Sequence, residues 1–262
     1  FFLITERFIA EKVFMQKVSD VLTLSASDLV GHLNCRHLTF LDLAVINGDI
    51  DKPEVWRDPQ LELLRERGAM HEQNYLKTLG SEVVKIDGAD ITDDAVKQTI
   101  EAMRVGKQII AQGALSNKGW HGRVDVLRRI EVPSKLGNWS YEVIDTKLAR
   151  ETKGGTILQL CLYSDLLAQI QGLDPEFMYV VVPWSNFEPR QFRFYDYAAY
   201  YRRVRSSLEK MASESDQLET YPDPKIHCEV CRWQINCDER RREDDHLYLV
   251  AGITKIQINE LK

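Results

Sequence analysis

Charged residues on two strands that otherwise look buried constrain this chain most. Residues 120–127 and 139–147 are rich in β-forming side chains and are separated by a turn-like segment containing proline and glycine, which predicts an antiparallel hairpin. Asp125 stands between two valines on the first strand, and Asp145 and Lys147 end the second. Because side chains alternate along a strand, Asp145 and Lys147 point to one face.

These three side chains suit a divalent-cation site if Asp125 lies opposite Asp145. Two carboxylates supply the hard oxygen ligands that Mg²⁺ or Mn²⁺ prefers. A metal bound there can polarise a phosphate and lower the pKa of a bound water, while Lys147 positions that nucleophile or stabilises charge on phosphorus. The alternative is a hairpin with solvated charges on one face. The pattern therefore indicates phosphodiester hydrolysis only in combination with other segments.

Two predicted helices add polar side chains to this set. The helical pattern that begins at Gly154 places Gln159 and Tyr163 four residues apart, hence on one face. Upstream, His71 lies late in a helical stretch, on a face that would aim it inward as a nitrogen ligand. The position four beyond it is Tyr75, which excludes a zinc-protease helix. The alternative is an ordinary amphipathic helix with a histidine in the core.

Taken in chain order, these segments resemble the RecB-like branch of the PD-(D/E)XK nucleases. The residues that carry the resemblance are Gly68-x-x-His71-Glu72, Gly122-Arg-Val-Asp125, Asp145-Thr-Lys147 and Gln159-x-x-x-Tyr163. The resemblance implies an α/β fold with a restriction-endonuclease-like core, in which helices flank a mixed central sheet. The side chains it implies for metal binding are His71, Asp125 and Asp145, with the backbone carbonyl of Thr146; those it implies for catalysis and support are Lys147, Gln159 and Tyr163. Many members have Glu where this chain has Asp145, so the arm to the metal is shorter here.

The cysteines form a second pattern. Three of them fall within ten residues near the C-terminus and one stands far upstream; these candidate ligands are Cys35, Cys228, Cys231 and Cys237. Such a set could hold zinc or an iron–sulfur cluster, and the spacing does not separate the two. For zinc, His227 or His246 is an alternative fourth ligand. Cys161, on the apolar face of the helix with Gln159, is expected to be a small buried hydrophobe.

The resemblance favours the iron–sulfur cluster over Zn²⁺. Some RecB-like nucleases, among them CRISPR-adaptation nucleases and the nuclease of the AddAB helicase complex, carry a [4Fe-4S] cluster held by one cysteine before the nuclease motifs and three after them. Here Cys35 precedes His71, and the other three cysteines follow Tyr163. The implied cluster is structural and staples a helical N-terminal segment to the C-terminal one, since metal ligation supplies folding energy.

Composition is that of a globular chain, with 44% hydrophobic and 28% charged residues. No apolar run approaches a membrane span, and the first residues are too short and too soon charged for a secretory signal, so we expect an intracellular, cytoplasmic protein with no membrane partner. The net charge of −6 is unusual for a protein that approaches phosphates, although whole-chain charge says little about a local groove. Basic residues that could follow a phosphate backbone are Arg123, Arg128, Arg129, Lys147, Arg150, Lys153, Arg202, Arg203 and Arg205.

The remaining patterns predict elements and domains. Strands are expected at 81–86, 177–183 and 190–195, and helices from about Leu24 through Cys35, over 92–111 and over 196–211; residues 1–23 read as a short strand or helix, and 247–253 as a helix start. The expected domains are an N-terminal helical segment (1–56), a nuclease core (57–211), a cysteine-cluster segment (212–246) and the start of a truncated helical extension (247–262). Tyrosines and arginines at the start of the 196–211 helix could stack bases of a single strand, although they are more often core and rim.

The expected function is a metal-dependent deoxyribonuclease that hydrolyses phosphodiester bonds in single-stranded DNA or at DNA ends. The expected partners are DNA and a helicase or other DNA-processing subunit, which some relatives carry as a fused domain. A first alternative is a non-catalytic nucleic-acid-binding module of a larger DNA-processing complex. A second is a zinc-bearing interaction domain.

Overall fold

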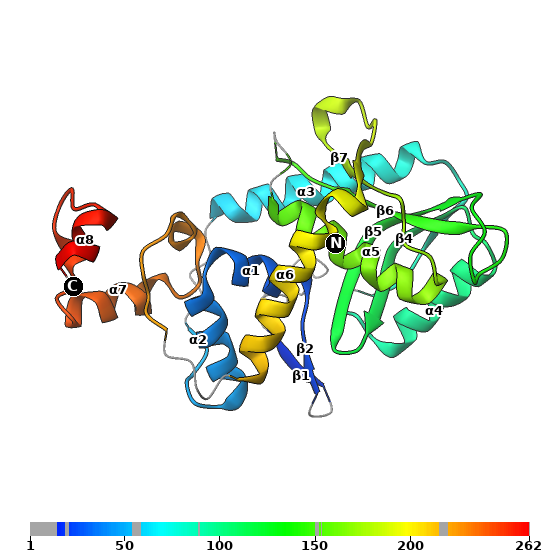
Figure 1. The fold of residues 1–262 in the computed structure, drawn as a ribbon. Helices are drawn as coiled ribbons and strands as arrows, with labels where there is room; N and C mark the ends of the chain where they lie inside the picture. Colours follow the sequence, from blue (N-terminus) through cyan, green and yellow to red (C-terminus); the bar gives the residue numbers. More distant parts are fainter. Residues whose placement is uncertain are drawn as a thin grey trace. The chain divides into compact units, whose positions relative to one another are not determined.

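The computed structural model describes residues 15–18, 21–53, 59–88, 90–149, 152, 154–214 and 220–261 (Figure 1). Its contacts divide the chain into two compact units, the first formed by residues 1–30 and 58–207 and the second by residues 31–57 and 208–262. Several expectations lie outside the described residues: the element at the start of the chain before residue 15, the basic residues Arg150 and Lys153, and most of the linker before Thr220.

The described chain alternates helices and strands. The strands are β1 (Gln16–Val18), β2 (Val21–Thr23), β3 (Val83–Lys85), β4 (Ile109–Asn117), β5 (Trp120–Ile130), β6 (Ser140–Thr146), β7 (Phe177–Val181) and β8 (Arg190–Arg193). The α-helices are α1 (Ala26–Asn34), α2 (Arg36–Asn47), α3 (Pro59–Thr78), α4 (Asp93–Arg104), α5 (Gly154–Gln171), α6 (Phe194–Ser213), α7 (Gln234–Glu243) and α8 (Lys255–Leu261). Short 3₁₀ helices are η1 (Pro183–Ser185), η3 (Ile226–Val230) and η4 (Leu247–Leu249).

A mixed six-stranded sheet in the order β3-β4-β5-β6-β7-β8 forms the centre of the first unit. β3 pairs with β4 and β6 with β7 in parallel, whereas the other neighbours are antiparallel. The predicted α/β class with a mixed, helix-flanked sheet is therefore confirmed. The predicted hairpin is confirmed as β5 and β6.

Helices α3 and α5 cover opposite faces of this sheet. Ile144 packs in one cluster with Tyr75 of α3, whereas its neighbour Asp145 accepts a hydrogen bond from Gln159 of α5. Successive side chains of a strand point to opposite faces, so these two contacts place the two helices on the two sides. The site described below lies on β5 and β6, between these two helical layers.

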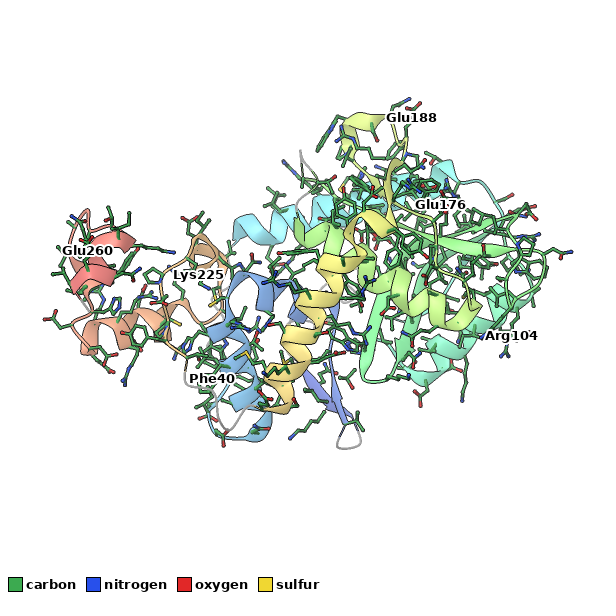
Figure 2. All side chains as sticks on the ribbon, viewed as in Figure 1. Phe40, Arg104, Glu176, Glu188, Lys225 and Glu260 are labelled. Atoms are coloured by element: carbon green, nitrogen blue, oxygen red, sulfur yellow. The ribbon has the colours of Figure 1, made fainter. Side chains whose placement is uncertain are left out.

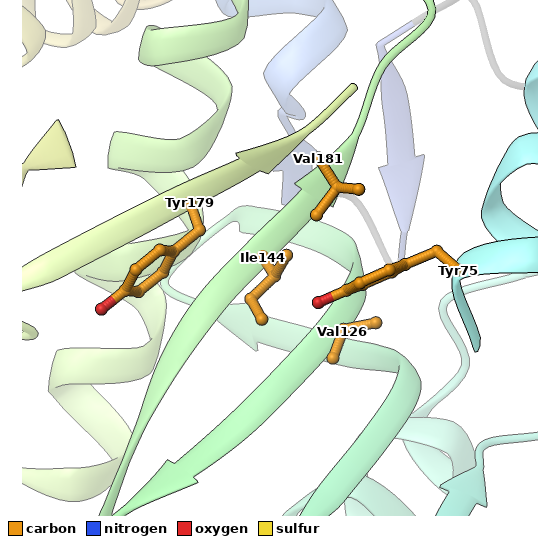
Figure 3. Packing of buried hydrophobic residues seen from close by; sticks show 5 residues of the cluster. All are labelled: Tyr75, Val126, Ile144, Tyr179 and Val181. Carbon is orange, nitrogen blue, oxygen red and sulfur yellow. The ribbon is translucent and has the colours of Figure 1, made fainter. Parts of the chain in front are cut away.

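The face toward α3 has an apolar core. Figure 3 shows Tyr75 reaching from α3 over side chains of adjacent strands, among them Val126, Ile144 and Val181. These three aliphatic side chains are fully buried, and Tyr75 is 2% exposed. Burying each such side chain contributes about 1.5–3 kcal/mol relative to exposing it. The strands that carry the charged residues are thus fixed by the apolar residues that alternate with them.

The second unit is held by a buried polar network as much as by apolar packing. Asp42 of α2 is 2% exposed and accepts hydrogen bonds from Arg232 Nε at 3.1 Å and Trp233 Nε1 at 2.8 Å. A buried carboxylate is tolerated only when charged or polar donors satisfy it. The network therefore ties α2 to the segment beside Cys231.

Three local expectations are wrong. The helix predicted over 92–111 ends at Arg104, because Gly106 adopts a φ of +76° that stops the helix, and the β-branched residues after it begin β4. Cys35 lies between two helices, in an extended conformation that caps α2, rather than within a helix. The pattern at 247–253 forms a 3₁₀ turn instead of a continuing helix.

Within the described ranges, every helix is too short or too polar to span a bilayer.

Candidate active site

The candidate active site lies where β5 and β6 stop pairing. The ladder between these strands ends at the pair Val126 and Ile144. The next residues on the two strands are Asp125 and Asp145, so the two carboxylates stand opposite each other just beyond the final pair, which meets the condition stated from the sequence. A sheet that opens at this point frees backbone groups for side chains to use.

Asp125 accepts a hydrogen bond from the Thr146 backbone N–H, which lies beyond the end of the β5–β6 ladder. Its Oδ2 accepts hydrogen bonds from the backbone N–H of Thr146 at 2.7 Å and from Thr146 Oγ1 at 2.8 Å. Two donors from one residue fix the orientation of the carboxylate, which therefore faces the end of β6.

Asp145 is the most deeply buried acid of the site, with 1% exposure. Its Oδ1 accepts a hydrogen bond from Gln159 at 3.1 Å, and its Oδ2 forms an ion pair with Lys147, whose Nζ lies 2.7 Å away. Burial raises the pKa of Asp145 to about 7, an effect that Lys147 opposes and Asp125 reinforces. The site thus contains a buried carboxylate whose two oxygens contact the Gln159 amide and the Lys147 ammonium.

Lys147 links the acids to solvent. Burial lowers its pKa, but the carboxylates of Asp145, Asp125 and Glu72 raise it by more, so the net shift is upward and the amine stays charged. Its side chain is 31% exposed. The ammonium can therefore contact both the buried acids and a group that arrives from outside.

Gln159 and Tyr163 of α5 support this pair, as expected from their spacing. Gln159 Nε2 donates to Asp145 Oδ1 and, at 3.0 Å, to the hydroxyl of Tyr163. Burial raises the pKa of Tyr163, with the charges of Asp145 and Asp125 adding to the shift, so the phenol stays protonated. A Cβ on Gly122 would lie 2.3 Å from the Tyr163 ring, so only glycine leaves room for this ring against β5.

His71 lies on α3, with 7% of its surface exposed. Its Nε2 is 3.2 Å from the carbonyl of Val181, the same carbonyl that accepts the backbone N–H of Lys147. Because a carbonyl only accepts, Nε2 carries the proton and the lone pair resides on Nδ1. Metal-binding histidines commonly donate the other ring N–H to a carbonyl in this way. The Phe187 ring stacks on the imidazole with centroids 5.6 Å apart.

Glu72 belongs to the motif that carries the resemblance, but it was not predicted as a metal ligand or catalytic residue. It accepts a hydrogen bond from Gln112 Nε2. Burial raises the pKa of Glu72 to about 7; Asp125 and, more weakly, Asp145 add to the shift, whereas Gln112 and Lys85 oppose it. A third carboxylate thus belongs to the same electrostatic group. Its place directly after His71 was the signal that could have indicated it.

Gln112 occupies the β4 position opposite Asp125, in a strained backbone conformation. The β4–β5 ladder pairs the residues on either side of it, but Gln112 itself has a φ of +56°. Its side chain bridges Glu72 to Arg123, whose Nε donates to Gln112 Oε1 at 3.2 Å. A left-handed non-glycine residue costs about 1–2 kcal/mol, and such strain is typical of functional sites.

Several basic residues expected to follow a phosphate backbone have structural partners instead. Arg123 is 7% exposed and donates to the carbonyls of Ile86 and Asp90, both at 3.0 Å. Arg128 lies over the Tyr179 ring, 4.3 Å from its centroid. Arg129 and Arg205 are likewise engaged, with the Gly106 carbonyl and with Asp165. Arg202 and Arg203 on α6 are exposed.

The residues of this site have the donor types that suit a divalent ion, but their side chains are not arranged around one. The carboxylates of Glu72, Asp125 and Asp145 are the oxygen donors that Mg²⁺ or Mn²⁺ prefers. As they stand, however, no three histidine, cysteine, aspartate or glutamate side chains among the described residues form a group that could hold a metal ion. The carboxylate oxygens that such an ion would bind already contact Lys147, in the case of Asp145 Oδ2, and Thr146, in the case of Asp125 Oδ2.

The four predicted cluster cysteines line one pocket in the second unit; they are Cys35, Cys228, Cys231 and Cys237. Burial raises the pKa of Cys237 to about 12, and its three companions contribute to the shift, as expected for neighbouring sulfurs. His227 lines the same pocket, whereas the ring of His246 stacks on Tyr221, with centroids 5.0 Å apart. Cys161 lies buried apart from them, as expected.

Comparison with known proteins gives little further information. No family model and no curated protein matches the sequence. A solved structure titled "Crystal structure of SSO0001" is 14% identical, with 88% of this chain and 90% of that chain covered at a TM-score of 0.39. A likeness this weak supports no statement about fold or function.

Proposed function

We propose that this chain is a metal-dependent nuclease that hydrolyses phosphodiester bonds in DNA, in single strands or at ends. The observation that carries the proposal is the opposition of Asp125 and Asp145 at the end of the β5–β6 ladder, with Lys147 Nζ 2.7 Å from Asp145. This is the arrangement that the resemblance to RecB-like PD-(D/E)XK nucleases implies, with a restriction-endonuclease-like core.

The proposed roles are those that the resemblance implies, and contacts support the ones given to Lys147, Gln159 and Tyr163. Asp125 and Asp145 would hold Mg²⁺ or Mn²⁺, with the Nδ1 of His71 and the Thr146 carbonyl as further ligands. Such an ion, when bound, supplies charge for the phosphate and a more acidic water. Lys147 stabilises negative charge on the phosphate or positions the attacking water. Gln159 and Tyr163 fix the carboxylate of Asp145 through the hydrogen bonds described above.

Glu72 adds a role that the resemblance did not supply. Its carboxylate is held by Gln112 and interacts electrostatically with both aspartates. A third acid increases the negative charge that a divalent ion compensates, and so favours ion binding.

We further propose a structural [4Fe-4S] cluster on Cys35 and the three C-terminal cysteines, with Zn²⁺ as the alternative. The support is that these four thiols line one pocket within one compact unit. The partners that fit this reading are DNA and a helicase or another DNA-processing subunit or fused domain. The competing proposal, a non-catalytic nucleic-acid-binding module, is weakened by the retention of Lys147 beside both acids.

The direct test is cleavage of end-labelled single-stranded DNA in Mg²⁺ or Mn²⁺. We expect Asp125→Ala and Lys147→Ala to lower the rate by at least about 100-fold, because each removes a charged group from the reacting centre. Lys97→Ala, on the exposed face of α4, is the matched control and should cleave like the parent. Equal rates for all four proteins would refute the assignment, and binding without cleavage in any divalent ion would favour the non-catalytic module.

A further inference from the structure

The turn between β7 and β8, residues 182–189, adjoins the candidate site and has no role in the chemistry proposed above. It projects from the sheet in Figure 1, with Glu188 at its outer end in Figure 2. It starts one residue after Val181, whose carbonyl holds both His71 and the backbone of Lys147. The turn thus begins directly after a carbonyl that contacts two proposed site residues.

The turn is rigid and strained. Pro183 and Pro189 restrict its two ends, and Ser185 donates through its backbone and its hydroxyl to the carbonyl of Val182 at 3.2 and 2.9 Å. Two consecutive non-glycine residues, Asn186 and Phe187, have φ values of +52° and +63°. For a bulky residue such as phenylalanine this conformation is a true outlier.

The strain has a clear structural result. It turns the Phe187 ring inward, where it stacks on His71 and on Tyr75, with centroids 5.6 and 6.2 Å apart. The turn is therefore clamped to α3 beside the candidate site. A surface turn needs no such anchor merely to connect two strands, and strain of this kind is typical of functional positions.

The side chain that this anchoring presents to solvent is Trp184. Its indole is 45% exposed, although it belongs to the first turn of a short 3₁₀ helix fixed by Pro183. It lies three positions after Val181, a distance of at most ~11 Å along the chain. The indole is therefore attached near the carbonyl that His71 and the Lys147 backbone share, on a turn whose backbone Pro183 restricts.

We propose that Trp184 is a stacking platform for an unpaired nucleobase next to the phosphate that the site cleaves. A planar, rigidly held aromatic ring binds any base face and does not select a sequence, because every base has a π surface. Arg190 on the edge strand β8 is exposed and adds a positive charge beside the turn. The platform selects single strands over duplexes, whose bases are already stacked on one another.

This inference rests on the proposed nuclease function, so its test separates binding from cutting. Binding is measured on an Asp125→Ala background with fluorescent single-stranded DNA, and cleavage on the otherwise native protein. We expect Trp184→Ala to weaken single-strand binding roughly 10-fold, with Trp184→Phe retaining most of the affinity. Binding of a duplex of the same sequence should change less than about twofold. Tyr248→Ala is the control and should bind single strands like the parent, since Tyr248 is similarly exposed, at 48%, but belongs to the second unit.

A strand with one abasic position, moved step by step along the sequence, locates the contact. One register should weaken binding of the parent by as much as Trp184→Ala does, and that register should have no further effect in Trp184→Ala, because coupled groups are not additive. Identical abasic profiles in the two proteins, or unchanged binding by Trp184→Ala, would overturn the platform. The same holds if the substitution changes only self-association or protein binding. If the abasic effect appears but the otherwise native protein cleaves no DNA, the platform stands and the nuclease proposal fails.

Discussion

At the residue scale, Gly122 determines how α5 meets the sheet. The Tyr163 ring occupies the space in which any Cβ at position 122 would lie, and the Tyr163 hydroxyl accepts the hydrogen bond that orients Gln159 toward Asp145. A missing side chain on β5 is thus connected to the orientation of a carboxylate on β6.

Gly122→Ala is expected to displace the Tyr163 ring and to reduce cleavage at least about 10-fold while the protein stays folded. The reason is that the new methyl group would approach the ring to 2.3 Å, so the ring and the Gln159 amide must move. The measurement is kcat and KM on single-stranded DNA, with unfolding followed by circular dichroism.

Gly68→Ala is the matched control, because a Cβ there meets only Leu148 at an ordinary 3.9 Å. Alanine within α3 should also raise stability by about 1 kcal/mol, since glycine is a poor helix former. If Gly122→Ala cleaves as fast as Gly68→Ala, the Tyr163 ring does not position the site.

The sequence allowed some of these residues to be predicted but not others. The hairpin and the shared face of Asp145 and Lys147 could be predicted because side chains alternate along a strand. That Asp125 lies opposite Asp145 depends on the register of the hairpin, which the sequence left open. Glu72 and Gln112 could not be predicted, because their hydrogen bond joins residues 40 positions apart and depends on a left-handed backbone at Gln112 that no periodic pattern encodes.

At the scale of elements, predictions succeeded where one local pattern dominated. Helix α5 and strand β7 have long, consistent apolar patterns, and Thr92 caps α4 as expected by accepting from the Ala95 N–H at 3.1 Å. The strand β4 was missed because the apolar residues after Gly106 continue a helical period by coincidence. Only pairing with β3 and β5 makes them a strand, and that pairing is not local.

Asp42→Ala is expected to destabilise the second unit by roughly 3–5 kcal/mol. It removes one partner of a buried ion pair and leaves the Arg232 guanidinium, whose side chain is 13% exposed, without its carboxylate. The measurement is urea unfolding followed by hydrogen exchange of peptides from α2. Asp51→Ala, an exposed residue beyond the same helix, is the control; equal effects of the two substitutions would contradict a stabilising role for the network.

At the scale of the whole molecule, the two units differ in how they are stabilised. The first has a continuous sheet with fully buried aliphatic side chains on β4–β7. The second combines two separate stretches of chain with few buried hydrophobics, chiefly Leu38, Leu43, Leu208, Met211 and Trp233. Units with small apolar cores commonly depend on a metal or disulfide staple.

Loss of the proposed cluster should therefore loosen the second unit alone. Cys228→Ser, or treatment of the parent with an iron chelator and oxidant, is expected to remove the brown colour that an iron–sulfur cluster would give and to increase hydrogen exchange in residues 31–53 and 220–246. The strands β4–β7 should keep their protection. Zinc in place of iron would give colourless protein with the same exchange pattern, whereas equal loosening of both units would contradict a local staple.

The end of the β5–β6 ladder has a consequence for how well the alignment of Asp125 and Asp145 withstands heating. Acids presented by loops can drift apart whenever the loop moves, but Asp125 and Asp145 continue from two of the most deeply buried strands. The separation of their backbones can change only if neighbouring strands part, which is the rarest fluctuation that a folded sheet makes. The reactive groups consequently persist as long as the sheet itself, and heating should abolish their alignment only when the first unit melts.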